Sequence, residues 1–197
     1  MNAIRKLLAQ RGFHYLATRF GPSWMRRLAF DGKFLSGDWA FGKDGSDELA
    51  EFVRTHCVGG DLLVMGCGGA ALLDQVPADN FSSVLGIDIS PEAIRLANER
   101  RAPNVHFEVA DMVAFRCPRP YNVILFAESL NYVPWFKRKS LLRRLCESLK
   151  PGGCIVVTLA QPERYTNITS LIRRKFKVIE DRNFTGSRRW LMAFRGA

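Results

Sequence analysis

A glycine-rich turn and an acidic residue are the first groups in this sequence whose types and spacing could bind a ligand. The turn, Gly66-Cys-Gly-Gly-Ala-Ala71, follows an apolar run, and its missing Cβ atoms let backbone N–H groups approach a ligand closely. Asp88 ends the next apolar run, 22 residues beyond Gly66, where a carboxylate can accept hydrogen bonds from both hydroxyls of a ribose. Together they predict an adenosine-type ligand. The alternative is a tight turn followed by a helix that Asp88 caps.

A second acidic position narrows the prediction to an adenine nucleoside. Asp111-Met112 follows a third apolar run. The short acidic side chain can accept a hydrogen bond from the exocyclic amine of adenine, and the methionine can pack on the ring.

The elements that must position these groups are short strands alternating with helices. The strands are expected at residues 61–66, 83–88, 105–109, 121–127 and 154–159. One helix is expected directly after the glycine-rich turn. Such alternation implies right-handed crossovers and a doubly wound α/β domain, in which ligands bind beyond the carboxyl ends of the strands.

Local signals place two further helices and a terminal hairpin. A helix is expected over 90–100, where Ser90 can cap the N-terminus. Another is expected over 134–149, stopping at Lys150-Pro-Gly-Gly153. The runs 175–180 and 189–195 predict an antiparallel hairpin that turns near Gly186.

Five motifs stand in order at the expected strand ends. They are Val64-Met-Gly-Cys-Gly-Gly69, Gly86-Ile-Asp-Ile-Ser-Pro-Glu-Ala-Ile94, Ala110-Asp-Met112, Phe126-Ala-Glu-Ser-Leu130 and Leu149-Lys-Pro-Gly-Gly153. This series resembles the class I S-adenosylmethionine-dependent methyltransferases. The resemblance implies a Rossmann-like, doubly wound α/β fold whose seven-stranded sheet has the order 3-2-1-4-5-7-6, with strand 7 antiparallel. It also divides the chain into an N-terminal helical lid, residues 1–57, and an S-adenosylmethionine-binding domain, residues 58–197.

The resemblance carries roles to individual residues. The cofactor, S-adenosylmethionine with S-adenosylhomocysteine as its product, would contact Gly66, Cys67, Gly68, Gly69, Asp88, Ile89, Asp111, Met112, Ala127 and Glu128. The chain departs from the family pattern at two positions. Val64 replaces an acidic residue that helps to orient the methionine amino group, and Ala70 replaces a common glycine. Glu128 could supply the missing carboxylate.

Methyl transfer from a sulfonium is an in-line displacement, so positioning and desolvation of the acceptor can supply most of the acceleration. Glu128 and Tyr132 are the candidate catalytic residues, with Glu128 as a general base or amine-orienting group. The alternative, weighed equally, is that Glu128 only binds cofactor or caps a helix. Asn131 and Trp39 are candidate substrate contacts, and Trp39 could instead pack in the core.

The net charge of +10 is concentrated at the two ends of the chain. Residues 1–30 contain six basic and no acidic residues, and residues 163–197 contain nine basic and three acidic residues. Such asymmetry fits an anionic acceptor, RNA or an anionic membrane surface, and equally a solubilising surface. Apolar residues near helical spacing indicate an amphipathic helix, favoured as a lid and secondly as a peripheral membrane contact: Ile4, Leu7, Leu8, Phe13, Leu16 and Phe20.

The numbers and spacing of cysteine and histidine argue against a disulfide framework and a metal site. The five cysteines and three histidines lack metal-ligand spacing, which predicts reduced thiols and no metal site. No apolar run is long enough to span a membrane and no secretory signal is visible, so a cytoplasmic protein is expected. The leading function is methyl transfer to an O or N atom of a small molecule or glycan. RNA methylation and cofactor binding without transferase activity are the alternatives.

Overall fold

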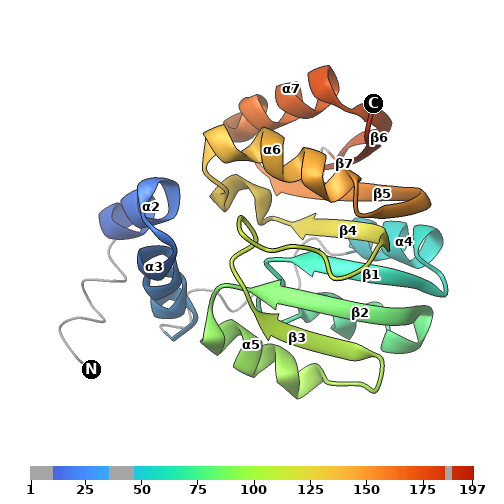
Figure 1. Ribbon diagram of the computed structural model, residues 1–197, viewed down its shortest axis with the longest axis horizontal. Helices are drawn as coiled ribbons and strands as arrows, with labels where there is room; N and C mark the ends of the chain where they lie inside the picture. The colour runs from blue at the N-terminus through green and yellow to red at the C-terminus, as the bar shows by residue number, and fades with distance from the viewer. Residues whose placement is uncertain (1–10, 36–46, 185–187) are drawn as a thin grey trace.

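A seven-stranded sheet forms the centre of the molecule. The computed structural model describes residues 11–35, 47–184 and 188–197. The sheet order β3-β2-β1-β4-β5-β7-β6 confirms the expected topology (Figure 1). Its strands are β1 Gly60–Met65, β2 Phe81–Asp88, β3 Val105–Val109, β4 Tyr121–Ala127, β5 Leu149–Ala160, β6 Lys177–Phe184 and β7 Arg189–Arg195.

Strands β1 to β5 are parallel, and β7 is antiparallel to both of its neighbours, β5 and β6. In the central pairings, Leu63 of β1 lies beside Leu85 of β2 and Ile124 of β4. The carboxyl ends of β1, β2, β3 and β4 therefore meet at one edge of the sheet, which is where a ligand site is expected.

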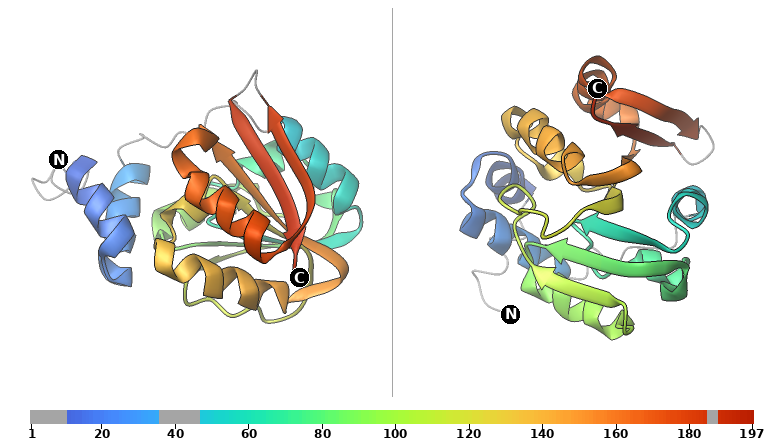
Figure 2. Two further views of the ribbon diagram at one scale, coloured as in Figure 1. Left: turned by 90° about the horizontal axis from the view of Figure 1, so that it is seen from above. Right: turned by 45° about the vertical axis from the view of Figure 1, so that its right-hand side comes forward.

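Helices cover both faces of the sheet. On one face, α4 (Asp47–His56) packs through Leu49, Phe52 and Val53 against the sheet residues Leu62 and Val123. On the other face, α6 (Trp135–Cys146) and α7 (Thr166–Lys175) bury the residues Leu141, Leu145, Ile168 and Ile172 (Figure 2). Each such large apolar side chain contributes roughly 1.5–3 kcal/mol when fully buried. Helix α4 is thus part of the packing of the sheet.

Two further helices lie beyond the carboxyl ends of the strands. These are α2 (Arg11–Phe20) and α3 (Ser23–Leu35), and they stand at the same end as the arrowheads of β1 to β4 in Figure 1. Helix α3 contacts α5 (Pro91–Ala97), the helix that follows β2. Residues 1–10 and Trp39 lie outside the described residues, so the expectations placed on them stay predictions.

Two local expectations were wrong, and a third holds except for the type of helix in its last turn. The helix after the glycine-rich turn is a single 3-10 turn, Ala71–Asp74, because Ala70 takes a left-handed conformation with φ 61° and β2 begins soon afterwards. The helix at 90–100 ends at Ala97 and continues as 3-10 turn. The segment Lys150-Pro-Gly-Gly153 is an irregular part of β5, where the pairing with β4 shifts register.

Candidate functional site

The glycine-rich turn is fitted closely between the ends of β2 and β4. The N–H groups of Gly66 and Cys67 both donate to the carbonyl oxygen of Ile87, at 2.8 and 2.9 Å. Gly66 has φ 76°, and a Cβ added there would lie 2.8 Å from the Ser129 Cβ and 3.0 Å from the Met112 Cε. Only glycine satisfies both the conformation and the space. The turn is therefore fixed in position next to Met112, one of the expected adenine contacts.

Asp88 lies at the end of β2 with its carboxylate held by backbone donors. One oxygen accepts from the Gly68 N–H at 3.0 Å and the other from the Ser90 N–H at 2.9 Å. Asp88 is only 8% exposed, and this burial raises the pKa of its carboxyl group while the two N–H groups oppose the rise. The cap of α5 is Ser90, whose hydroxyl accepts from the Ala93 N–H at 3.1 Å. Asp88 instead ties the glycine-rich turn to β2.

Asp111, after β3, is paired with α3. One of its oxygens accepts from the Val113 N–H at 3.0 Å, and the other accepts from the Ser23 hydroxyl at 2.7 Å and from the Arg26 guanidinium. The Arg26 and Asp111 side chains are 7% and 13% exposed. The expected adenine-binding carboxylate is therefore also the anchor of an N-terminal helix.

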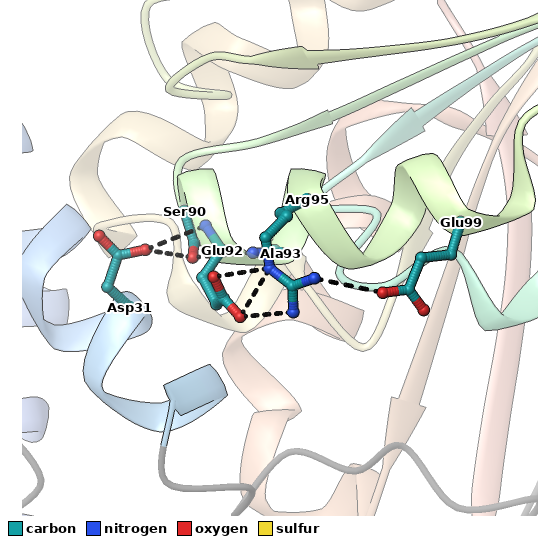
Figure 3. Close-up of polar contacts among 6 residues, drawn as sticks. All are labelled: Asp31, Ser90, Glu92, Ala93, Arg95 and Glu99. Carbon is teal, nitrogen blue, oxygen red and sulfur yellow. Dashed lines mark hydrogen bonds and ion pairs between the residues drawn. The ribbon is translucent and has the colours of Figure 1, made fainter.

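A second anchor joins α3 to the start of α5 (Figure 3). The Asp31 carboxylate accepts from the Ser90 hydroxyl and, at 3.5 Å, from the Glu92 N–H. It also contributes, after burial, to the raised pKa of Asp88. Helix α3 is thus fastened at the ends of β2 and β3, over the two expected nucleoside contacts.

Glu128, at the end of β4, joins three strands. It has φ 54°, and its carboxylate accepts from the Ala160 N–H of β5 and from Arg189 of β7, the latter at 3.5 Å. Burial raises the pKa of the Glu128 carboxyl group, against the lowering effects of the Ala160 N–H, Arg189 and Thr158. A carboxylate with a raised pKa and two neighbouring donors is equipped to accept a proton or to hold an ammonium group.

Tyr132 and Asn131 follow Glu128 in a short 3-10 turn, Leu130–Tyr132. The Tyr132 ring packs edge-on against Phe30 of α3, with 5.2 Å between ring centroids. Burial and then Tyr165 raise the pKa of Tyr132 to about 12, so its phenol is protonated at neutral pH. Within the described part of the chain, the Asn131 Oδ1 is buried and accepts no hydrogen bond.

A cavity of about 750 Å³ opens beside the turn. Its polar lining includes Glu128, Thr158 and Arg189, whereas Asp88, Asp111 and Tyr132 are not among the lining residues. Apolar side chains on the α4 face of the sheet line the rest: Leu49, Leu62, Val64, Leu72, Leu73, Val84 and Phe107. The short turn Ala71–Asp74 covers less of the sheet than a crossover helix would, which accounts for the hollow. Val64 also lines this cavity.

Residues 62–153 match a family model described as a methyltransferase domain. Over these residues the chain is similar to methyltransferase domains, and its fold is that of solved methyltransferases.

Relatives agree with this assignment. A trans-aconitate 2-methyltransferase of Methylobacterium nodulans is 42% identical over 97 residues, which make up 48% of this chain and 36% of that protein. The chain therefore matches about a third of that relative's length. The N-methyltransferase NodS from Bradyrhizobium japonicum, solved with S-adenosyl-L-homocysteine, superposes with a TM-score of 0.64 at 20% identity, covering 80% of this chain and 91% of NodS. The CcbJ methyltransferase from Streptomyces caelestis gives 0.70 at 15% identity, covering 85% and 97%.

The methyltransferase domain brings most expected site residues to one edge of the sheet. The exception that cannot be placed is Trp39, which lies outside the described residues. Arg26, Asp31, Thr158 and Arg189 were not expected there. They come from α3, β5 and β7, and no local pattern marks them. Within the described ranges, no group of histidine, cysteine or acidic side chains could hold a metal ion.

Proposed function

We propose that this chain is an S-adenosylmethionine-dependent methyltransferase that methylates an O or N atom of a small molecule or glycan and releases S-adenosylhomocysteine. The observation that carries the proposal is the arrangement of three neighbouring strand ends. The Gly66–Gly69 turn, Asp88 and Asp111 follow β1, β2 and β3, which lie side by side in the sheet.

The cofactor contacts follow this order of strands. The turn would lie along the amino acid part, with Cys67 among its contacts, and Asp88 with Ile89 would hold the ribose. The Asp88 carboxylate accepts backbone N–H groups at both oxygens, and since a carboxylate has about four acceptor positions, it would still accept a ribose hydroxyl. Asp111 and Met112 would frame the adenine.

The reaction itself would take place beyond β4. The cofactor supplies an electrophilic methyl group, and Ala127 with Glu128 would line the side that bears it. Glu128, with its raised pKa, would take the proton of a hydroxyl acceptor or orient an amine. Tyr132 would act as a neutral hydrogen-bond donor, and the Asn131 Oδ1 would accept a hydrogen bond from the substrate.

Several features favour a small acceptor over RNA. A cavity of about 750 Å³ lies in the range of small-molecule sites. Four of the nine basic residues in the C-terminal segment are paired with carboxylates, as Arg173–Asp181, Arg182–Glu180, Arg188–Glu163 and Arg189–Glu128. One relative is named as a trans-aconitate 2-methyltransferase. All five cysteines are free thiols, which supports a reducing, cytoplasmic location.

Labelled methyl transfer tests the proposal. The protein is incubated with S-adenosylmethionine labelled in its methyl group and with separate pools of small metabolites, glycans, RNA and protein. Label in the metabolite or glycan pool supports it, and label only in RNA overturns the acceptor class. If calorimetry shows S-adenosylhomocysteine binding but no pool is labelled, the chain binds cofactor without transferring methyl groups. Binding of NAD in preference to S-adenosylhomocysteine would overturn the whole assignment.

A further inference from the structure

Helices α2 and α3 expose an unusual number of large apolar side chains. Phe20 and Trp24 are 66% and 61% exposed. Leu16 lies four residues before Phe20, and Leu28 four residues after Trp24, so each pair shares one side of its helix. Single exposed apolar residues are ordinary, but several large ones on two neighbouring helices are what an interaction surface would supply.

The start of α6 continues this group. Trp135 and Phe136 are exposed there, three and four residues after Tyr132. Tyr132 itself contacts Phe30 of α3, which fixes the two regions as neighbours. Figure 2 shows the N-terminal end of α6 beside the α2–α3 pair at one end of the molecule in both views. We call seven exposed apolar and basic residues of α2, α3 and the start of α6 the outer face: Phe20, Trp24, Arg27, Trp135, Phe136, Lys137 and Lys139.

The charge of the outer face has a single sign. Residues 11–30 and 129–146 contain no acidic residue. Arg27, Lys137 and Lys139 are exposed among the apolar side chains. The acidic residue of α3, Asp31, is turned toward Ser90 and the methyltransferase domain (Figure 3). Helices that lie in a membrane interface have this composition, with basic residues among aromatic and aliphatic side chains.

The outer face is also held in place before any partner binds. The Arg26–Asp111 pair and the Asp31–Ser90 hydrogen bond fasten α3 to the domain. A surface that is already ordered loses little conformational entropy on binding. In the part of the chain that the structure describes, no helix has the length and apolarity to cross a bilayer.

We propose that the outer face docks the protein peripherally on an anionic lipid bilayer. Phe20, Trp24, Trp135 and Phe136 enter the interface, and Arg27, Lys137 and Lys139 meet the anionic headgroups. Charge complementarity selects this partner, because a neutral apolar partner would not need cations around its contacts. The inference is independent of methyl transfer, so it can stand or fall separately from the proposed function.

Vesicle co-sedimentation tests the proposal, using the full chain with phosphatidylglycerol–phosphatidylcholine vesicles and with pure phosphatidylcholine vesicles. Native protein should bind the anionic vesicles, more weakly as salt increases. Phe20→Ser with Trp24→Ser should weaken binding about tenfold or more, since both apolar contacts are lost. Arg27→Glu with Lys137→Glu should weaken it by at least about tenfold, because each basic residue near an anionic surface contributes about fivefold.

Matched substitutions elsewhere provide the controls. Val58→Ser with Ile179→Ser removes exposed apolar residues outside the outer face, and Lys177→Glu reverses an exposed charge on β6. These variants should bind like the native protein. Equal binding by the outer-face and control variants would overturn the proposal, and so would equal binding of native protein to neutral and anionic vesicles or no binding to either. Circular dichroism confirms that each variant is folded.

Discussion

Replacing Asp88 by asparagine tests both its role in the fold and its proposed role in ligand binding. Its carboxylate accepts the Gly68 N–H at 3.0 Å and the Ser90 N–H at 2.9 Å. Asparagine keeps one oxygen, but its NH₂ group faces one of these two donors. One buried N–H then loses its acceptor, which costs roughly 1–3 kcal/mol of the free energy of unfolding.

The same substitution removes an acceptor from the ribose. Loss of one charge-assisted hydrogen bond, roughly 1.5–3 kcal/mol, should weaken binding of S-adenosylhomocysteine roughly 10- to 150-fold. Alanine would leave both N–H groups without a partner, so asparagine is the better probe. Titration calorimetry measures affinity, and urea denaturation shows that the variant is folded at the assay temperature.

Asp79→Asn is the matched control, since Asp79 is exposed in the 3-10 turn before β2. This variant should change neither the affinity for S-adenosylhomocysteine nor the free energy of unfolding. If folded Asp88→Asn binds S-adenosylhomocysteine as tightly as native protein, the assignment of Asp88 to the ribose is wrong. If affinity falls while the free energy of unfolding is unchanged, the backbone hydrogen bonds of Asp88 contribute nothing to the fold.

Three further predictions concern the turn, α3 and acid stability. The Glu128 carboxylate already accepts hydrogen bonds from β5 and β7. Val64→Asp should therefore tighten S-adenosylhomocysteine binding several-fold in calorimetry, because the new carboxylate would meet the amino group of the ligand. Unchanged affinities in this variant and in Glu128→Gln would refute our interpretation of the turn. Arg26→Ala removes the ion-pair partner of the buried Asp111 carboxylate, which keeps the Ser23 hydroxyl and the Val113 N–H, and should cost roughly 3 kcal/mol in urea denaturation; Arg95→Ala, which breaks an exposed pair with Glu92, should cost far less. Although burial opposes it, hydrogen bonds from its neighbours hold the pKa of Asp61 well below its ordinary value, so its contribution is present above about pH 4 and is lost as the pH falls. Asp61→Asn should therefore flatten the acid limb of the stability profile, and an unaltered limb would contradict this.

The residues at the strand ends could be predicted because the local sequence marks where each strand ends. Buried parallel strands are short apolar runs, and the residues that follow them sit at the same edge of the sheet. That reasoning placed Gly66, Asp88 and Asp111 correctly along the sheet without knowledge of any contact.

The contacts between distant segments could not be predicted in the same way. Arg26 reaches Asp111 across 85 residues, and Arg189 reaches Glu128 across 61. Neither pair leaves a periodic signal, since each depends on how separate elements pack. The missing crossover helix had a local cause that propensity did not reveal, namely the left-handed conformation of Ala70 close to the start of β2.

The double use of Asp111 implies a reciprocal coupling. One of its oxygens serves Ser23 and Arg26 of α3, and the other serves the Val113 N–H. A ligand amine that draws on this carboxylate competes with α3 for it. By thermodynamic linkage, if docked α3 lowers the affinity of that ligand by some factor, the bound ligand lowers the equilibrium constant for docking of α3 by the same factor. If adenine binds at Asp111 as proposed, its binding and the docking of α3 on the sheet are therefore two parts of one equilibrium.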